Sequence, residues 1–340
     1  MKKIILISVI VLVPILMCAE IFGKVGTAGL QFLKLGIDAR ATGMGEAYIA
    51  VSDDISSVYW NPAGLATKLE HQAFFSHTEW PAEIKHEFAA VSFTDGIQAL
   101  GLSASVLHMD DMDETTEEFF GPTGRTFTNS DIALGLTYSN AFTDKFAFGI
   151  TGKYLRQNLS EFSIDSYAFD IGSLYNTQWK NFTIGMTLRN FGPDFIYEID
   201  NDGDGLTDED PFDLLDNDGD GLIDEDGPEL GFKIPMSFSL GVSMELINYE
   251  EQVLLIAAQL DNVVDREETW NIGSEYLYRN FALRAGYQIG YDAASYSFGA
   301  GFKVPTRMAI FNLDYAYTDM GDLTENFING VHRFSVKMSF

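Results

Sequence analysis

PMSFSLGVSMEL, residues 235–246, is the stretch whose alternation decides the fold. Apolar residues take turns with small or polar ones, namely Phe238, Leu240, Val242, Met244 and Leu246 against Ser237, Ser239, Gly241, Ser243 and Glu245. Because successive side chains of a β-strand point to opposite faces, this period of two predicts a strand with one apolar face. The segment FTIGMTL at 182–188 repeats the pattern. One such strand also fits a soluble half-buried sheet, so the fold depends on how often the pattern recurs.

The alternation recurs in about fourteen segments between residue 70 and the C-terminus. Most have ten or more residues, whereas soluble strands usually have about five or six and a tilted strand crossing a bilayer needs roughly 9–11. The lengths therefore favour membrane-spanning strands. The predicted strands are residues 70–80, 84–93, 97–108, 130–141, 145–158, 164–179, 181–190, 235–247, 251–262, 268–279, 281–291, 294–304, 308–319 and 331–340.

The connections between these segments alternate in length. Those after even-numbered strands are tight, as at 94–96, whereas those after odd-numbered strands include 109–129, 191–234 and 320–330. Short turns at one rim and long loops at the other are typical of bacterial outer-membrane barrels. The sequence therefore predicts an all-β fold, a transmembrane antiparallel β-barrel of about fourteen strands over residues 70–340, with both termini in the periplasm. A secreted soluble β-protein is the alternative.

Both ends of the chain fit export to an outer membrane. Two lysines precede a 14-residue apolar run at 4–17, which is short for a membrane-spanning helix and typical of a secretory signal peptide. We expect residues 1–23 to be removed, with cleavage near 19–23 and the loss of Cys18, so no disulfide is predicted. At the other end, Phe340 closes an alternating strand, which resembles the signal read by the bacterial barrel-assembly machinery.

The formal net charge is −29, and much of it is concentrated in one loop. Residues 194–231 hold 16 Asp or Glu and no Lys or Arg. A strongly acidic protein repels phosphates, so nucleic acid is not expected as a partner. Within the loop one pattern occurs twice, 16 residues apart, as DNDGDGLTDED at 200–210 and DNDGDGLIDED at 216–226.

The spacing of the carboxylates in each repeat predicts a Ca²⁺ site. Aspartates at positions one, three and five supply oxygens to a hard cation, and glycine at position six permits the sharp turn. Position seven offers its backbone carbonyl, and position nine contributes directly or through water. The expected ligands are Asp200, Asp202, Asp204, Leu206, Asp208, Asp210, Asp216, Asp218, Asp220, Leu222, Asp224 and Asp226. Asp213 and Glu229 are alternatives to Asp210 and Asp226 as the acidic residue that completes a shell. By the predicted orientation, this calcium-binding insert at 194–231 lies outside the cell.

The repeats depart from an EF-hand at position twelve. Pro211 and Gly227 stand where an EF-hand has its bidentate glutamate. The two loops therefore look more like the calcium repeats of thrombospondin type 3 or dockerin. A solvated acidic loop without metal is the alternative.

The stretch ahead of the first strand is the most specific part of the sequence. FLKLGIDARATGMGEAYIA at 32–50 and SDDISSVYWNPAGLA at 52–66 resemble the N-terminal signature of the PorV/PorQ family. That family is similar to FadL-type transporters, so the resemblance implies a fourteen-stranded barrel with an N-terminal plug, here residues 24–69. It also implies an outer-membrane accessory protein that binds secreted cargo, or translocon components, of a type IX secretion system.

The residue types of this segment suit a tightly turned plug. Glycine permits turns that residues with a Cβ atom resist, and Asn61-Pro62-Ala63-Gly64 is a turn-type cluster. The signature residues are Gly36, Arg40, Gly43, Met44, Gly45, Asp53, Asp54, Trp60, Asn61, Pro62 and Gly64. A purely structural plug and a mobile hatch that gates a lumen or a lateral opening are both consistent with these residues.

Catalytic motifs are absent from the sequence. None of the five histidines belongs to HExxH, and neither GxSxG nor a Gly-rich phosphate loop occurs, so we expect no enzyme. Three functions remain open at this point. They are an accessory barrel of type IX secretion, a FadL-type transporter of small hydrophobic compounds, and a structural or adhesive barrel that presents the calcium loop.

Overall fold

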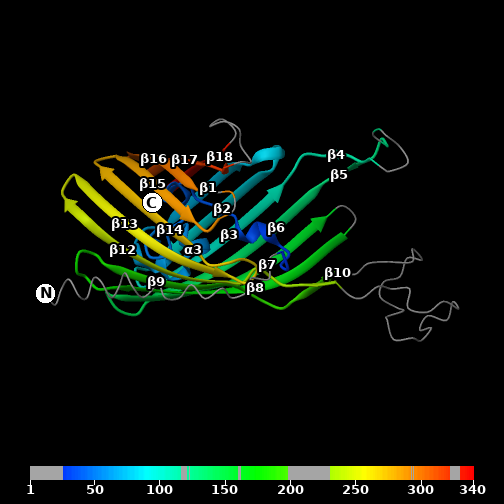
Figure 1. Cartoon of the computed structure of the whole chain (residues 1–340). Coiled ribbons are helices and arrows are strands. Elements are labelled where there is room, and N and C mark those ends of the chain that lie inside the picture. Colours follow the sequence, from blue (N-terminus) through cyan, green and yellow to red (C-terminus); the bar gives the residue numbers. More distant parts are fainter. Residues whose placement is uncertain are drawn as a thin grey trace.

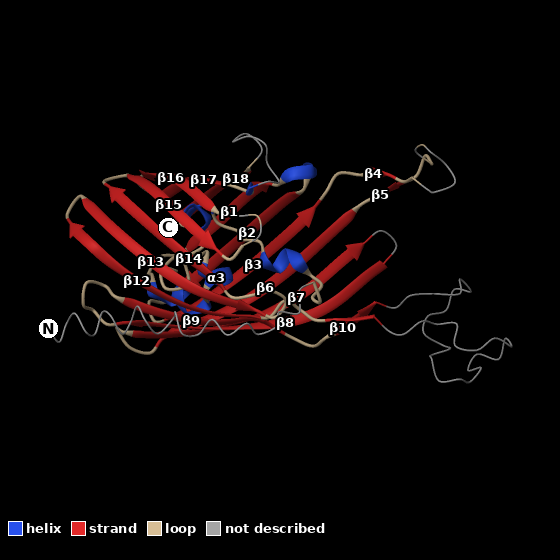
Figure 2. Ribbon diagram, in the orientation of Figure 1, coloured by secondary structure: helices blue, strands red, loops and turns tan. Residues whose placement is uncertain are grey.

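The computed structural model describes residues 26–115, 121, 123–159, 162–197, 230–291, 293, 295–321 and 330–340. In this part of the chain, fourteen antiparallel strands form a closed barrel, which confirms the predicted fold (Figure 1, Figure 2). The barrel strands are β1 (Gln72–Glu79), β2 (Lys85–Thr94), β3 (Gln98–His108), β6 (Asn129–Ala141), β7 (Phe146–Leu159), β8 (Phe162–Asn176), β9 (Thr183–Phe191), β12 (Ser237–Tyr249), β13 (Gln252–Val263), β14 (Thr269–Tyr278), β15 (Phe281–Ile289), β16 (Tyr296–Pro305), β17 (Ile310–Thr318) and β18 (Val331–Ser339).

Each strand pairs with its neighbours along the chain, and β1 pairs with β18 to close the cylinder. The pairing Gln72↔Ser339 fixes that closing register, and Phe340 donates its backbone N–H to the carbonyl of His71 just beyond it. Closure removes the free edges that would otherwise present unpaired backbone groups to lipid. The last strand therefore completes the hydrogen bonding of the whole wall.

The outer face carries the apolar half of each alternation. Phe238 and Leu240 are exposed on β12, while Ser239 between them is fully buried. Leu283 is 62% exposed on β15, next to the buried Arg284. The apolar face of each strand thus points away from the barrel axis, as expected for a barrel surrounded by lipid.

Two small ribbons extend the barrel at the rim that carries the long loops. One is β4 (Met112–Asp113) with β5 (Thr126–Phe127), and the other is β10 (Phe195–Tyr197) with β11 (Leu230–Phe232). The second ribbon brings both ends of the acidic insert together. The predicted calcium ligands from Asp200 to Asp226 lie outside the described residues, as does the predicted signal peptide.

The N-terminal segment, residues 26–70, lies inside the barrel (Figure 1). It contains η2 (Gln31–Lys34), α2 (Ala39–Gly43), α3 (Ser57–Trp60) and η3 (Pro62–Thr67), and a further turn, η4 (Pro81–Glu83), lies between β1 and β2. Asp38 caps α2 by accepting from the backbone N–H of Arg40, and Asn61 does the same for Ala63 at the start of η3. No helix among the described residues is long and apolar enough to cross a membrane.

The wall is irregular where β8 meets β9. The pairing shifts between Phe169↔Phe191 and Ile171↔Leu188, and Asn190 adopts a left-handed φ of 58°. The backbone N–H of Asn190 donates to the carboxylate of Asp170 at 2.8 Å. As a result two consecutive residues, Arg189 and Asn190, are both buried, where a regular strand would bury only one.

Candidate functional site

The N-terminal segment meets the barrel wall where the inner face carries glycine. A Cβ atom at Gly149 of β7 would overlap the carbonyl group of Pro62, and one at Gly286 of β15 would overlap the backbone of Gly45. Gly45 itself has a φ of +62°, which favours glycine. Small residues on the wall therefore let the segment's backbone approach the strands directly.

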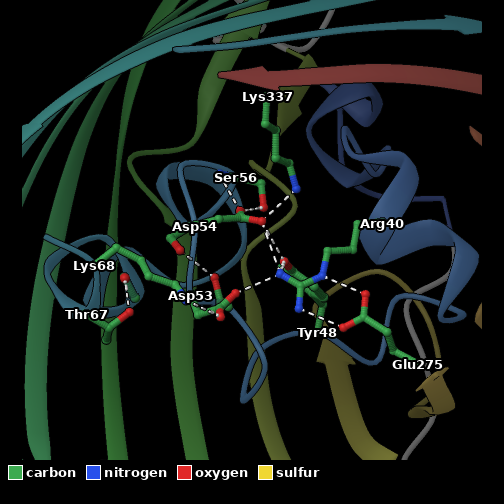
Figure 3. A network of polar contacts seen from close by, with 12 residues as sticks. Arg40, Tyr48, Asp53, Asp54, Ser56, Thr67, Lys68, Glu275 and Lys337 are labelled. Carbon is green, nitrogen blue, oxygen red and sulfur yellow. Dashed lines mark hydrogen bonds and ion pairs between the residues drawn. The ribbon is translucent and has the colours of Figure 1, made fainter. Parts of the chain in front are cut away.

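Arg40 of α2 is the centre of an ionic network that joins the segment to the wall (Figure 3). One end of its guanidinium lies 2.7 Å from Asp53 and 3.2 Å from Asp54, and it also donates to the hydroxyl of Tyr48. The other end forms two bonds, of 2.9 and 2.8 Å, to Glu275 on β14. This paired geometry is the strongest form of arginine–carboxylate contact.

Two further strands extend the network along the wall. Glu275 accepts from Arg284 of β15 at 2.8 Å, and Arg284 in turn lies 2.7 Å from Asp314 of β17. All three side chains are at most 4% exposed. The carboxylate that receives Arg40 is therefore itself held by an arginine of the next strand.

Lys337 of β18 makes a second connection between wall and segment. Its ammonium lies 2.7 Å from both Asp38 and Asp54, and its side chain is 4% exposed. Asp54 also accepts from the backbone N–H of Ser56 at 2.9 Å. The last strand of the barrel thus binds the segment at two of its acidic residues.

The network joins four cations to five carboxylates, namely Arg40, Lys68, Arg284 and Lys337 with Asp38, Asp53, Asp54, Glu275 and Asp314. Buried ion pairs offset their desolvation only when geometry is good and further hydrogen bonds satisfy the remaining lone pairs. Removing one partner of such a pair costs roughly 3–5 kcal/mol, because the other charge is left buried and uncompensated. The network therefore resists displacement of the segment.

The pKa values of Asp53 and Asp54 indicate that both aspartates carry the negative charge that the ionic network requires. Burial raises the pKa of Asp54, but Lys337 and Arg40 outweigh that effect and hold the pKa well below its ordinary value. Burial likewise raises the pKa of Asp53, and Arg40 and Lys68 lower it below its ordinary value. Both carboxylates are therefore ionised at neutral pH.

A second polar cluster lies at the irregular part of the wall. Lys153 of β7 is 2.5 Å from Asp170 and donates to the side-chain oxygen of Asn190 at 2.9 Å. Arg189 stacks over the rings of Tyr59 and Trp60, at 5.1 and 5.7 Å from their centroids. The irregular stretch of β9 thus contacts the aromatic pair of α3.

The structure brings the predicted signature residues together inside the barrel. Arg40, Asp53 and Asp54 belong to the ionic network, Trp60 packs edge-on against Tyr48, and Asn61 donates to the carbonyl of Ser173 at 3.2 Å. The remaining signature positions are buried against the wall or within the segment, namely Gly36, Gly43, Met44, Gly45, Pro62 and Gly64. Whether the segment is a fixed plug or a mobile hatch stays a prediction.

The sequence-based prediction did not include the charged strand residues that bind the segment or support its binding. These residues are Glu275, Arg284, Asp314 and Lys337. A signal for them existed, because each is a charged residue at an inward position of an alternating strand. Their pairing with Arg40 carries no local signal, since Arg40 and Glu275 lie 235 residues apart.

Two enclosed cavities between the segment and the wall are small. One cavity beside Trp60 and Arg189 measures about 40 Å³, and another beside Phe32 and Phe88 about 30 Å³. Sites for drug-sized ligands measure roughly 300–1,000 Å³. A larger, open concavity of about 460 Å³ lies at the short-turn rim, between residues 50–53 of the segment and the turns.

Solved structures with a similar fold include a FadL homologue and two toluene transporters. A FadL homologue from Pseudomonas aeruginosa superposes with a TM-score of 0.55 at 13% identity, over 89% of this chain and 98% of that one. The toluene transporter TbuX of Ralstonia pickettii gives a TM-score of 0.54 at 10% identity, over 89% of this chain and 97% of that one. The toluene transporter TodX of Pseudomonas putida also gives a TM-score of 0.54, at 14% identity, over 89% of this chain and 96% of that one. At these identities the likeness defines the fold alone, which is that of a FadL-like β-barrel.

The family follows from the sequence itself. Residues 20–214 match the family described as type IX secretion system protein PorV, and no curated protein matches the chain. This chain belongs to the PorV family and is an outer-membrane barrel related to type IX secretion. That it has no catalytic activity stays a prediction.

Proposed function

We propose that this protein is an accessory barrel of a type IX secretion system that binds secreted cargo proteins at the cell surface. The observation that carries the proposal is the filled lumen, in which the N-terminal segment is bonded to β14 and β18 through Arg40 and Lys337. A barrel whose interior is occupied by its own chain suits binding at its rim better than passage through its centre. Membership of the PorV family supports the same reading.

Transport of small hydrophobic compounds is the competing function. It draws support from the fold of the toluene transporters. Against it, the two enclosed cavities of about 40 and 30 Å³ lack the volume for such a ligand, and the concavity of about 460 Å³ is open at the short-turn rim. Passage would require the segment to move and would leave several buried charges without partners, at a cost of several kcal/mol.

We further propose that the acidic insert at 194–231 is a surface loop stabilised by calcium. The ribbon of β10 and β11 pairs residue 197 with residue 230, which brings the two ends of the insert together. Phe195 stacks on Phe232 within this ribbon at 6.1 Å. We infer that the insert lies outside the cell, binds Ca²⁺ through its alternating aspartates and offers a folded surface to a partner.

The test of cargo binding is affinity purification of the tagged barrel from outer membranes of its own organism, followed by mass spectrometry. Secreted proteins or translocon components should co-purify. As a matched variant, residues 198–229 are replaced by a short Gly-Ser linker between β10 and β11, which leaves the barrel intact and tests whether the insert takes part. Recovery of small hydrophobic molecules with no protein partner would favour the transporter instead.

The calcium prediction needs a separate test on the whole barrel in detergent. Calorimetry should detect calcium binding at millimolar ion or below, and EDTA should expose the insert to protease. Changing Asp202, Asp204, Asp218 and Asp220 to asparagine should abolish both effects. Equal protease sensitivity of the unchanged protein with and without calcium would refute the calcium loop while leaving cargo binding open.

A further inference from the structure

A polar cavity lies between the N-terminal segment and the wall, towards the rim of the long loops. Its volume is about 40 Å³. Lys34, Glu46 and Trp60 line it from the segment, and Arg189, Ser237 and Asp261 line it from β9, β12 and β13. Neither the ionic network around Arg40 nor the proposed surface loop uses this cavity.

Several hydrogen-bond donors at this cavity have no partner. Nε and Nη1 of Arg189, Nε1 of Trp60 and the hydroxyl of Ser237 are all buried and unbonded among the described residues. Arg189 is 9% exposed and forms no ion pair with any carboxylate in the described ranges. Arg266, which also lines the cavity, has an unbonded Nε. Donors that are buried in this way cost free energy unless something accepts from them.

The nearby carboxylates do not serve as that acceptor. Asp261 already accepts from Ser239, from Gln259 at 2.9 Å and from Asn271 at 2.8 Å. Asp265 is held by Lys34 at 2.9 Å. Glu46 also lines the cavity, with one oxygen beside Gly36. None of these carboxylates bonds to the open donors, one of which belongs to the buried guanidinium of Arg189.

The size of the cavity limits what can fill it. A single water needs roughly 10–15 Å³ of such space, so about 40 Å³ accommodates two or three waters or one small anion. The unbonded Nε and Nη1 of Arg189 lie on different sides of its guanidinium, so each donates to a separate acceptor atom, and the indole N–H of Trp60 adds a third donor. A long acyl chain does not fit.

We propose that this cavity is a binding site for a small carboxylate anion, held by Arg189 of the wall and Trp60 of the segment. Such an anion neutralises the buried guanidinium and joins α3 to β9 where the strand pairing is irregular. The site thereby adds a second, ligand-dependent connection between segment and barrel. It does not depend on the proposed role in secretion.

The test is thermal unfolding of the full barrel in detergent with sodium formate, against sodium gluconate at equal ionic strength. Formate fits the cavity, whereas gluconate is too large. The unfolding midpoint should rise with formate and saturate, and should not respond to gluconate, because only the anion that binds the folded state stabilises it. Arg189→Gln should abolish the response, while Arg279→Gln, which changes an exposed arginine at a short turn, should retain it.

Trp60→Phe provides an independent variant, because it keeps the ring over Arg189 and removes only the indole N–H. Its formate affinity should fall by about tenfold, the loss expected for one hydrogen bond to a charged group. The proposal is overturned if formate gives no saturable shift, if gluconate gives the same shift, or if Arg189→Gln responds as the unchanged protein does. If Arg189→Gln does not fold, an unaltered affinity in Trp60→Phe overturns it equally.

Discussion

At the scale of single residues, Lys337 connects the last strand of the barrel to the segment. It supplies the positive charge for two buried aspartates, and no other cation contacts Asp38 among the described residues. The sequence shows Lys337 only as a charged residue on the polar face of the last strand. Its role depends on contacts with Asp54 and Asp38, which lie 283 and 299 positions earlier in the chain. No local sequence pattern encodes these contacts.

We predict that Lys337→Met loosens the N-terminal segment. The substitution leaves Asp38 and Asp54 buried without their shared cation, at a cost of roughly 3–5 kcal/mol. Limited proteolysis in detergent should then cut within residues 36–60, whereas the unchanged barrel should resist cleavage there because these residues are mostly buried. Lys145→Met, which alters an exposed lysine at a short turn, is the matched control and should behave like the unchanged protein. Equal resistance of both variants would show that Lys337 does not hold the segment.

A pH dependence follows from the same aspartates. Their pKa values are lowered in the folded state, so they stabilise it above the ordinary pKa of about 3.9, and this contribution is lost as pH falls below that value. The unfolding midpoint should be nearly constant from about pH 5 to 8 on this account and should fall below about pH 4. In Asp54→Asn the fall should be smaller, and an identical acid profile would contradict the assignment.

At the scale of elements, the strands were predictable and the path of the segment was not. Alternation and length mark β12 or β18 in the sequence because each strand has one face in lipid. The short helical turns of the segment are too brief to show a period, and their positions are set by distant glycines of the wall. The insert's aspartates were recognisable as repeats, while the ribbon of β10 and β11 at its base was not foreseen.

Gly149→Val tests the contact between β7 and η3. Its Cβ atom would overlap Pro62, so η3 should leave the wall and the segment should become accessible to protease. Gly152→Ala on the same strand is the control, because a Cβ atom there meets only Phe169 at an ordinary 3.8 Å. If Gly149→Val stays as resistant as Gly152→Ala, η3 does not rest on β7 in solution.

At the scale of the whole molecule, two features coexist. The wall is that of a FadL-like barrel, and the interior is occupied by residues 26–70 of the same chain. Closure of the wall follows from the need to satisfy every backbone group in lipid. The occupied interior follows from the glycines of the wall and the paired charges between wall and segment. Together they make the rims, rather than the lumen, the parts available to a partner.

Conductance across a planar lipid bilayer tests this central claim most directly. The unchanged barrel should insert without forming a stable open channel, because the segment fills it. A variant lacking residues 27–70, shown to be folded by its β-sheet circular dichroism and its resistance to heat in detergent, should conduct ions. Steady, porin-like conductance of the unchanged barrel would contradict the filled lumen and the function proposed from it.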